Sequence, residues 1–204
     1  MAIVLITNNE LSVTRGFGLL EPLLARMRAR KANQLIPQHL REGKILDVGC
    51  GSMPYFLLNT RFGEKFAIEQ FKPALELRSI NLKVLDLQKN SNLPFEDSFF
   101  SIVTMLAVIE HLDQEVLICL LRELHRILIP GGMAIITTPA SWSDKLLHFM
   151  ARIRLVSRQE IDEHKCAYNL TMLENHFNKA GFTMQKIRCG YFEIFLNLWL
   201  VAEK

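Results

Sequence analysis

The sequence has no two closely spaced cysteines and no strong excess of charge of one sign. Its Lys and Arg number 24 and its Asp and Glu 21, an excess too small for a surface that coats nucleic acid. No CxxC pair and no His at zinc-ligand spacing occurs, so we expect neither a disulfide framework nor a zinc module, and a reducing cytoplasm fits best. The four cysteines are scattered, at Cys50, Cys119, Cys166 and Cys189.

Long apolar runs are also missing. None reaches the roughly 18 residues that a membrane span needs, and the nearest candidate, residues 190–202, is interrupted by Glu193. The first seven residues contain an apolar stretch but no basic segment and no small-residue cleavage site, so we expect no signal peptide. With 204 residues, half of them apolar, the chain can form one domain with a full core. We expect a soluble, cytoplasmic protein without a transmembrane segment.

From residue 44 onward, short β-type runs alternate with helix-period segments, a pattern typical of crossover units around a parallel sheet. The clearest helix is predicted over residues 115–128, behind a cap at Asp113 and before Pro130. We predict an α/β fold, a Rossmann-like three-layer sandwich with a mostly parallel seven-stranded sheet. The last two strands follow each other around Gly190, which predicts a hairpin and one antiparallel edge strand. The predicted strands cover residues 44–48, 65–69, 82–87, 100–106, 133–138, 182–188 and 193–202.

The residues before this alternation form a predicted helical extension, residues 1–40, in front of a domain over residues 41–204. Its helix ends near Pro37 and has an apolar stripe of Leu20, Leu23, Leu24 and Met27 among several basic residues. We expect this helix to lie across the sheet or over the site. The alternative is a membrane-surface or substrate-gathering role.

An insert at about residues 140–168 separates the fifth predicted strand from the last long helix. Its large apolar residues alternate with basic ones. It is either a lid with an apolar inner face and a basic rim, which suits a lipid-like or anionic substrate, or an ordinary amphipathic packing helix. The apolar residues are Trp142, Leu146, Leu147, Phe149, Met150, Ile153, Leu155 and Val156, and the basic ones are Lys145, Arg152, Arg154 and Arg158.

The most informative stretch joins Asp47 to the turn Gly49-Cys50-Gly51, at the end of the first predicted strand. Glycines without a Cβ atom let a ligand lie against the backbone, beside the N–H groups of the helix that follows. A dinucleotide fingerprint is disfavoured, because Pro54 replaces its third glycine and Asp47 would repel a pyrophosphate. A ligand that carries an ammonium and a sulfonium, as S-adenosylmethionine does, would be attracted.

Two more acids follow at the ends of the second and third predicted strands. Glu69, 22 residues after Asp47, is placed to accept hydrogen bonds from two ribose hydroxyls. Asp86 is placed to accept one from an adenine amino group, with the backbone of Leu87 against the ring. A single acid at a strand end is more often a cap or a solvated turn residue. Three acids in this order with the glycine turn favour a cofactor site.

Five motifs in order give a more specific signal than any of them alone. They are LDVGCG at 46–51, LPF at 93–95 with FFSIV at 99–103, EHL at 110–112, RELHR at 122–126 with LIPGG at 128–132, and KAGF at 179–182. On these motifs the chain resembles the class I S-adenosylmethionine-dependent methyltransferases over about residues 40–204, and it is most similar to their small-molecule branch of ubiquinone and menaquinone enzymes. Two positions depart from the family pattern. Met53 replaces a third glycine, and Glu69 replaces the usual Asp.

The resemblance implies S-adenosylmethionine as the cofactor and assigns a role to each matching position. The methionine part would lie among Asp47, Gly49, Cys50 and Gly51. Further cofactor contacts are implied for Glu69 at the ribose, Asp86 and Leu87 at the adenine, and Leu106 and Ala107 near the methyl group, and Gln70 is also named as a cofactor-binding residue.

Methyl transfer requires a nucleophile held in line with the breaking bond, and a general base is optional. For a hydroxyl acceptor, His111 is the first candidate base and His164 the second. The alternatives are that His111 holds backbone at a strand-to-helix junction, together with Glu110, and that His164 is a solvated residue of the insert. We expect no metal, because no group of His and acids beyond Glu110-His111 shows ligand spacing.

The function we expect is methyl transfer to oxygen or carbon of an unidentified small-molecule or lipid-linked acceptor, with peripheral membrane contact as an option. The fourth strand ends in Leu106-Ala107, without the Asn-or-Asp-Pro-Pro-aromatic signature that grips planar amino groups. Nucleic acid is therefore an unlikely partner. The alternatives are an RNA or protein methyltransferase, recruited through the basic amino-terminal helix, and a non-catalytic protein that binds the cofactor.

Overall fold

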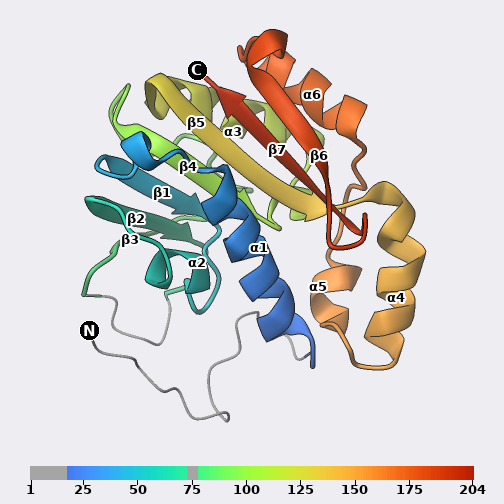
Figure 1. Cartoon of the computed structure of the whole chain (residues 1–204). Helices are drawn as coiled ribbons and strands as arrows, with labels where there is room; N and C mark the ends of the chain where they lie inside the picture. Colours follow the sequence, from blue (N-terminus) through green and yellow to red (C-terminus); the bar gives the residue numbers. More distant parts are fainter. Residues whose placement is uncertain (1–17, 73–77) are drawn as a thin grey trace.

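A computed structural model describes residues 18–72 and 78–204 as a seven-stranded sheet covered by helices on both faces (Figure 1). The apolar start of the chain, where no signal peptide is expected, lies outside the described residues. The strands are β1 (Lys44–Val48), β2 (Glu64–Glu69), β3 (Asn81–Val84), β4 (Phe100–Leu106), β5 (Leu128–Pro139), β6 (Ile187–Phe192) and β7 (Asn197–Glu203). The longer helices are α1 (Glu21–Leu35), α3 (Gln114–Ile127), α4 (Asp144–Arg152) and α6 (Leu170–Lys179), and α2 (Tyr55–Leu58) and α5 (Arg158–Asp162) are short.

The order of the strands is β3-β2-β1-β4-β5-β7-β6. Strand β1 pairs in parallel with both β2 and β4, so the direction of winding reverses between β1 and β4. In open α/β sheets a ligand binds beyond the carboxyl ends of the strands at this reversal. The antiparallel strand is β7, which lies between β5 and the edge strand β6. The predicted Rossmann-like fold is confirmed.

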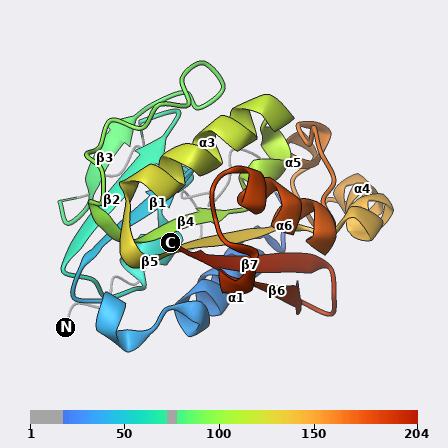
Figure 2. The same ribbon diagram turned by 90° about the horizontal axis from the view of Figure 1, so that it is seen from above.

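Alternating side chains of each strand divide the core into two layers. Ile45, Ile102 and Ile135 pack on the face that α1 and α2 cover. Leu46 and Val103 point to the opposite face, where α3 and α6 lie (Figure 2). Because both faces are buried, the central strands β1 and β4 are mostly apolar and do not alternate regularly with polar residues.

Helix α3 confirms the sequence periodicity, because its buried positions recur every three to four residues. They are Leu117, Leu120, Leu121, Leu124 and Ile127. The helix ends at Ile127, and Pro130 already belongs to β5. Asp113 is the N-cap residue but makes no capping hydrogen bond, and its carboxylate accepts one from Lys165 Nζ at 2.8 Å.

Four predicted strands differ by several residues from those of the structure. The fifth, predicted over residues 133–138, is longer and covers Leu128–Pro139. The third ends at Val84 instead of residue 87, which leaves Leu85 and the two residues after it free to line a site. The sixth begins at Ile187, because Met184–Lys186 form a 3-10 turn, and the seventh begins at Asn197, after the turn of the β6–β7 hairpin. Hairpin boundaries depend on turn geometry, and apolar pattern alone does not fix them.

The predicted apolar stripe of α1 is wrong in its orientation. Leu23 is 49% exposed and Met27 36%, whereas Ala29 and Ala32 are buried against the sheet. The small side chains of Ala29 and Ala32 let the helix backbone come close to the strands. The larger side chains of Leu23 and Met27 therefore lie on the solvent side of the helix. Helix α1 lies both across the sheet and over the site, since its second half packs on the sheet and its first half borders the cavity.

The start of α1 is hydrogen-bonded to the insert. Leu20 N donates to Leu155 O at 2.8 Å, and the Ser157 amide donates to the buried carboxylate of Glu21, also at 2.8 Å. These bonds join two segments that are more than 130 residues apart in sequence into one structural unit. Within the described ranges, no helix combines the length and the apolar character that crossing a bilayer requires.

Candidate cofactor and acceptor site

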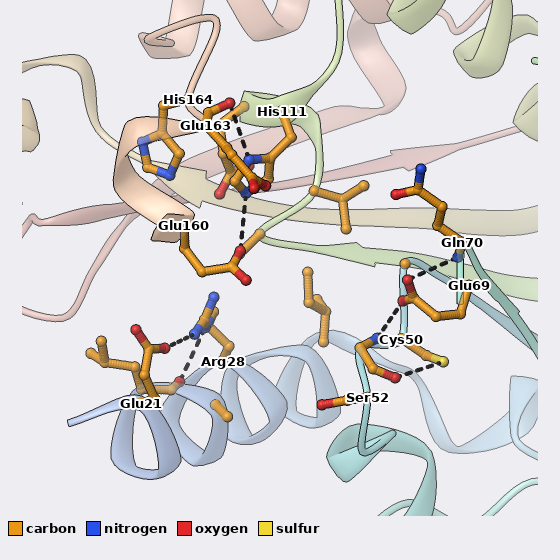
Figure 3. A pocket seen from close by; sticks show the side chains of 18 of the residues that line it. Glu21, Arg28, Cys50, Ser52, Glu69, Gln70, His111, Glu160, Glu163 and His164 are labelled. Atoms are coloured by element: carbon orange, nitrogen blue, oxygen red, sulfur yellow. Dashed lines mark hydrogen bonds and ion pairs between the residues drawn. The ribbon is translucent and has the colours of Figure 1, made fainter. Parts of the chain in front are cut away.

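One cavity of about 700 Å³ opens beyond the carboxyl ends of the strands, and it has the size of a small-molecule site (Figure 3). Every residue that the sequence nominated lines it. These are Asp47, Gly49, Cys50, Gly51, Glu69, Gln70, Asp86, Leu87, Leu106, Ala107, His111 and His164. The structure thus brings together the ends of four strands and two histidines from distant segments.

The backbone angles of the turn require glycine at two positions. Gly49 has φ +75° and Gly51 φ +77°, backbone angles that residues with a Cβ atom rarely adopt. A Cβ atom on Gly49 would also lie 2.6 Å from Cγ2 of Val108. The turn lines the cavity, and its shape is fixed by hydrogen bonds from the Gly49 and Cys50 amides to Ile68 O and from the Gly51 amide to Glu69.

Asp47 is a buried acid beneath this turn. Thr104 Oγ1 donates a hydrogen bond of 2.6 Å to its Oδ1. Burial raises the pKa of Asp47 to about 7, against the opposing effect of the Thr104 hydrogen bond and with a smaller raising effect from the charge of Glu69. A cationic ligand beside Asp47 would stabilise the ionised form, so this position selects for positive charge.

Glu69 joins the second strand to the glycine turn. Its carboxylate accepts hydrogen bonds from the Gly51 amide and from the Gln70 amide, both at 2.8 Å. Figure 3 shows this carboxylate between the turn and Gln70, at the edge of the cavity. The long Glu side chain in place of the family's usual Asp therefore reaches across to the turn and orders it.

The Cys50 side chain is not a candidate nucleophile. Burial raises the pKa of its thiol, and the nearby charges of Asp47 and Glu69 raise it further. A thiol needs a lowered pKa to react as the thiolate. Cys50 therefore serves as a small buried side chain in the turn.

The adenine-side and methyl-side positions lie on two further strand ends. Asp86 Oδ1 accepts from the Gln88 amide at 3.1 Å, in the loop that follows β3. At the end of β4, Ala107 has φ +57°, a left-handed conformation for a residue with a Cβ atom. Its amide donates to Thr137 O of β5 at 2.9 Å, which fixes this bend at the edge of the cavity.

At the opposite end of the cavity, the two histidines pack against each other. The ring centres of His111 and His164 are 5.0 Å apart, in an edge-to-face arrangement. His111 Nδ1 lies 3.4 Å from the carbonyl oxygen of Glu163, and His111 Nε2 lies 3.7 Å from the Glu160 carboxylate (Figure 3). Burial lowers the pKa of His164, so this ring favours the neutral form, which can accept a proton.

A buried acid completes this cluster. Glu110 accepts a hydrogen bond from Thr138 Oγ1 at 3.1 Å, and the potential ligand atoms of Glu110, His111 and His164 all lie within 4.8 Å of one another. Such a group is one that a divalent ion could occupy. Sequence spacing does not show this group, because His164 comes from the insert. Metal independence nevertheless stays our prediction.

Two parts of the cavity wall were not identified from the sequence. Helix α1 contributes Glu21, Leu24 and Arg28, and the β6–β7 turn contributes Glu193. Arg28 lies 3.8 Å from the carboxylate of Glu21. Burial raises the pKa of Glu193, and its Oε1 has no hydrogen-bond partner among the described residues. Arg28 could have been identified from the sequence as a charged residue within the apolar stripe of the first helix. The residues around Glu193 contain no pattern that indicates a role in the site.

The insert forms the outer wall of the cavity. Leu147, Met150 and Val156 face inward, together with Leu24 of α1. Of the eight apolar residues that the sequence analysis names in the insert, Trp142, Leu146, Phe149 and Ile153 are exposed and do not belong to an inner face. The insert is thus apolar on two sides.

Comparison with known proteins gives one family. Residues 20–187 match the family model described as "Methyltransferase domain". The chain is similar to the "Probable tRNA methyltransferase 9B" of Homo sapiens, with 29% identity over 169 residues, which cover 79% of this chain and 34% of that protein. The chain therefore spans about a third of the length of this curated relative.

Solved structures share the fold at low sequence identity. A SAM-dependent methyltransferase from Archaeoglobus fulgidus superposes with a TM-score of 0.68 at 17% identity, covering 89% of this chain and 94% of its own. A methyltransferase from Haloferax volcanii, solved in complex with the Trm112 methyltransferase activator, superposes with a TM-score of 0.67 at 15% identity, covering 89% and 92%.

Proposed function

The chain belongs to the methyltransferase-domain family, whose cofactor is S-adenosylmethionine, and from this premise we propose that it methylates a small or lipid-linked acceptor inside the described cavity. One observation carries the proposal. A single continuous cavity has the glycine turn with Asp47 and Glu69 at one end, and the histidine–acid cluster of Glu110, His111 and His164 at the other. Donor and acceptor can therefore meet inside one cavity.

The residues at the turn fit S-adenosylmethionine. Gly49 and Gly51 line the cavity, and the buried carboxyl of Asp47 beside them has Thr104 as its hydrogen-bond partner and no cation among the groups that shift its pKa. We assign Asp47 and the turn to the cationic methionine part, Glu69 with Gln70 to the ribose, and the loop of Asp86 and Leu87 to the adenine. The bound cofactor supplies an electrophilic methyl group.

The acceptor end is built to exclude water and to accept a proton. Leu24, Leu147 and Met150 form an apolar wall. His111 is held by the Glu163 carbonyl, and Gln88 Nε2 donates to the His111 carbonyl at 2.8 Å. We assign proton removal from an acceptor hydroxyl or acidic carbon to His111, with His164 as its neighbour and second candidate.

Four acids around this end favour an acceptor with hydrogen-bond donors or positive charge over a free phosphate. They are Glu21, Glu160, Glu163 and Glu193. The unpartnered Oε1 of Glu193 is well suited to accept a hydrogen bond from an acceptor hydroxyl. A hydroxylated, partly apolar molecule, of the kind that the ubiquinone- and menaquinone-type branch methylates, fits these features.

A second candidate function is RNA methylation. It is supported by the similarity to a protein named for tRNA methylation, and by the fold shared with a methyltransferase that binds the activator Trm112. In this case a single nucleotide would have to leave its stack to enter the cavity. A protein acceptor and a non-catalytic cofactor-binding role complete the alternatives.

Methyl transfer from labelled S-adenosylmethionine tests these candidates directly. The purified chain is incubated separately with a cell metabolite fraction, a lipid extract and total tRNA. We expect label in the small-molecule or lipid fraction, and loss of that label with His111→Ala but not with His148→Ala, a control at an exposed histidine of α4. Label in tRNA alone would establish the second candidate, and no binding of S-adenosylhomocysteine at millimolar concentration would exclude every candidate.

A further inference from the structure

Helix α4, the 3-10 turn before it and the residue after it carry a row of large apolar side chains that face solvent. Trp142, Leu146, Phe149 and Ile153 follow each other at intervals of four, three and four positions, so they lie on one side of the helix. They are 55%, 40%, 59% and 49% exposed. The inward side of α4 is already satisfied by Leu24, Val156 and Ile161. The outer row therefore contributes nothing to the core.

The turn of the β6–β7 hairpin adds two more exposed apolar residues. Ile194 is 87% exposed and Phe195 is 64% exposed. Glu193, Ile194 and Phe195 all have φ between 52° and 68°, an unfavourable conformation for three consecutive residues with side chains. The turn is held by a hydrogen bond from the Leu196 amide to Glu193 O at 3.1 Å, and by one from Asn197 to the Glu193 side chain. A fixed backbone thus presents both side chains to solvent.

Helix α1 supplies the third part of this surface, with Leu23 and Met27 exposed. We call Leu23, Met27, Trp142, Leu146, Phe149, Ile153, Ile194 and Phe195 the apolar rim. Neighbouring residues of the same three segments line the cavity, namely Leu24, Leu147 and Glu193. Figure 1 shows the start of α1, the hairpin turn and α4 around the same end of the molecule. The apolar rim therefore lies on the solvent side of three segments that also contribute to the cavity wall.

Positive charge is concentrated in two of these segments, α1 and the insert. Residues 22–35 and residues 145–158 contain no Asp or Glu, yet they hold eight of the 24 Lys and Arg of a chain that is almost neutral overall. Arg26 and Arg30 are exposed beside Leu23 and Met27, and Arg152 and Arg154 are exposed beside Ile153. Exposed Trp, Phe and aliphatic side chains flanked by cations are typical of surfaces that insert into anionic membranes.

We propose that the apolar rim docks on an anionic lipid bilayer, which places the cavity against the membrane surface. This inference rests on the proposed function in one respect, since docking would deliver a lipid-linked acceptor to the histidine–acid cluster. Nucleic acid fits the rim less well, because Leu, Ile and Met side chains do not stack on bases as aromatic rings do. A bilayer uses both the aliphatic residues and the arginines.

Vesicle sedimentation of the purified chain tests the docking. We expect binding to vesicles of phosphatidylcholine mixed with phosphatidylglycerol, and at least about tenfold weaker binding to phosphatidylcholine alone. The double variant Phe149→Glu/Ile194→Glu should lower binding to the mixed vesicles at least about tenfold. The matched control is Met184→Glu, which changes a 40% exposed residue before β6, at the far end of the hairpin from its turn, and should bind as the parent does.

Binding of S-adenosylhomocysteine, measured without vesicles, shows whether each variant is folded and separates this inference from the proposed function. Equal sedimentation of the parent and the double variant would overturn the docking while leaving methyl transfer intact. So would a dimer of the parent chain that the double variant cannot form, since the rim would then be a contact between copies. Binding of RNA that the same double variant abolishes would likewise overturn it.

Discussion

The Gly51 amide donates a hydrogen bond of 2.8 Å to the carboxylate of Glu69, and this bond connects the glycine turn after β1 to the end of β2. A second amide, that of Gln70, donates to the other oxygen at the same distance. The acid proposed to hold the cofactor ribose therefore also orders the turn that is proposed to receive the methionine part. Cofactor binding and local structure depend on the same side chain.

Replacing Glu69 should therefore weaken cofactor binding strongly. We expect Glu69→Ala to reduce the free energy of S-adenosylhomocysteine binding by about 2–4 kcal/mol, because hydrogen bonds to a charged acceptor contribute roughly 1.5–3 kcal/mol each. Isothermal titration calorimetry measures this change. Glu64→Ala, on the same strand but with a 53% exposed side chain that pairs with Lys44 at 3.6 Å, serves as the control. An unchanged dissociation constant for Glu69→Ala would refute the ribose assignment.

Binding of S-adenosylmethionine should depend on pH through Asp47. Its pKa of about 7 in the free protein lies above the usual range because the carboxyl is buried, and a cationic ligand favours the ionised form. Affinity should therefore rise from about pH 5.5 to about pH 7.5. Titrations across this range with the parent and with Asp47→Asn test the point, since the variant should bind weakly and without this pH dependence. An equal pH dependence in both would assign the effect to another group.

The same pKa predicts the opposite trend for stability. A group whose folded pKa is raised stabilises the protein below its unfolded pKa, and this contribution is lost as the pH rises through the folded value. The free energy of unfolding without cofactor should therefore decrease from about pH 4 to about pH 7, and Asp47→Asn should reduce the decrease. Urea unfolding at several pH values measures it. A parent and a variant with parallel profiles would contradict this prediction.

Removal of the His111 imidazole should affect turnover more than binding. For an acceptor that loses a proton, we expect His111→Ala to lower kcat at least about 100-fold, with the KM for S-adenosylmethionine nearly unchanged. Steady-state kinetics with the acceptor found by the labelling experiment provide both values. His148→Ala should behave like the parent, because that histidine is half-exposed on α4 and faces Asp144. A parent-like kcat for His111→Ala would place proton removal elsewhere.

Two glycines with the same backbone angle should differ in their tolerance of alanine. Gly49 has φ +75° and Gly131 φ +77°, but a Cβ atom meets Val108 at 2.6 Å in the first case and nothing within 4 Å in the second. Gly131→Ala should cost about 1–2 kcal/mol of unfolding free energy from backbone strain. Gly49→Ala should cost about 1–3 kcal/mol more, because its neighbour must move. Thermal unfolding compares the two variants. Equal losses of unfolding free energy would show that the Val108 side chain can move away without cost.

Treatment with a chelator should leave methyl transfer unchanged. The methyl group is already activated by the sulfonium, and the side chains of Glu110 and His111 have protein partners in Thr138 and Glu163. Activity before and after EDTA dialysis measures the effect, with added Zn²⁺ and Mn²⁺ as the reconstitution arm. Loss of activity that metal restores would show that Glu110, His111 and His164 bind a metal ion.

The sequence predicts the sheet well where local pattern decides. Strands β1 and β4 are mostly apolar because both faces of the sheet are buried, and the turn at Gly49 and Gly51 is predicted because glycine tolerates its backbone angles best. Helix α3 has a complete apolar period. These features need no knowledge of distant segments.

Features that depend on tertiary contacts were predicted less well. In α1 the buried residues are Ala29 and Ala32, since close approach to the sheet selects small side chains over the larger Leu23 and Met27. The β6–β7 turn adopts left-handed angles without glycine, so no local signal marks it. The contact between His164 and His111 likewise depends on how the insert folds back over the strand ends, and this cannot be predicted from composition or local pattern.

The hydrogen bond from Ser157 to Glu21 has a consequence for engineering this domain. A chimera that imports only the insert of a relative, or only its first helix, leaves a buried carboxylate opposite a backbone that no longer matches it. Such a hybrid should lose stability before its substrate preference can be assessed. Transplanted selectivity therefore requires that both segments be exchanged together, as a single cassette.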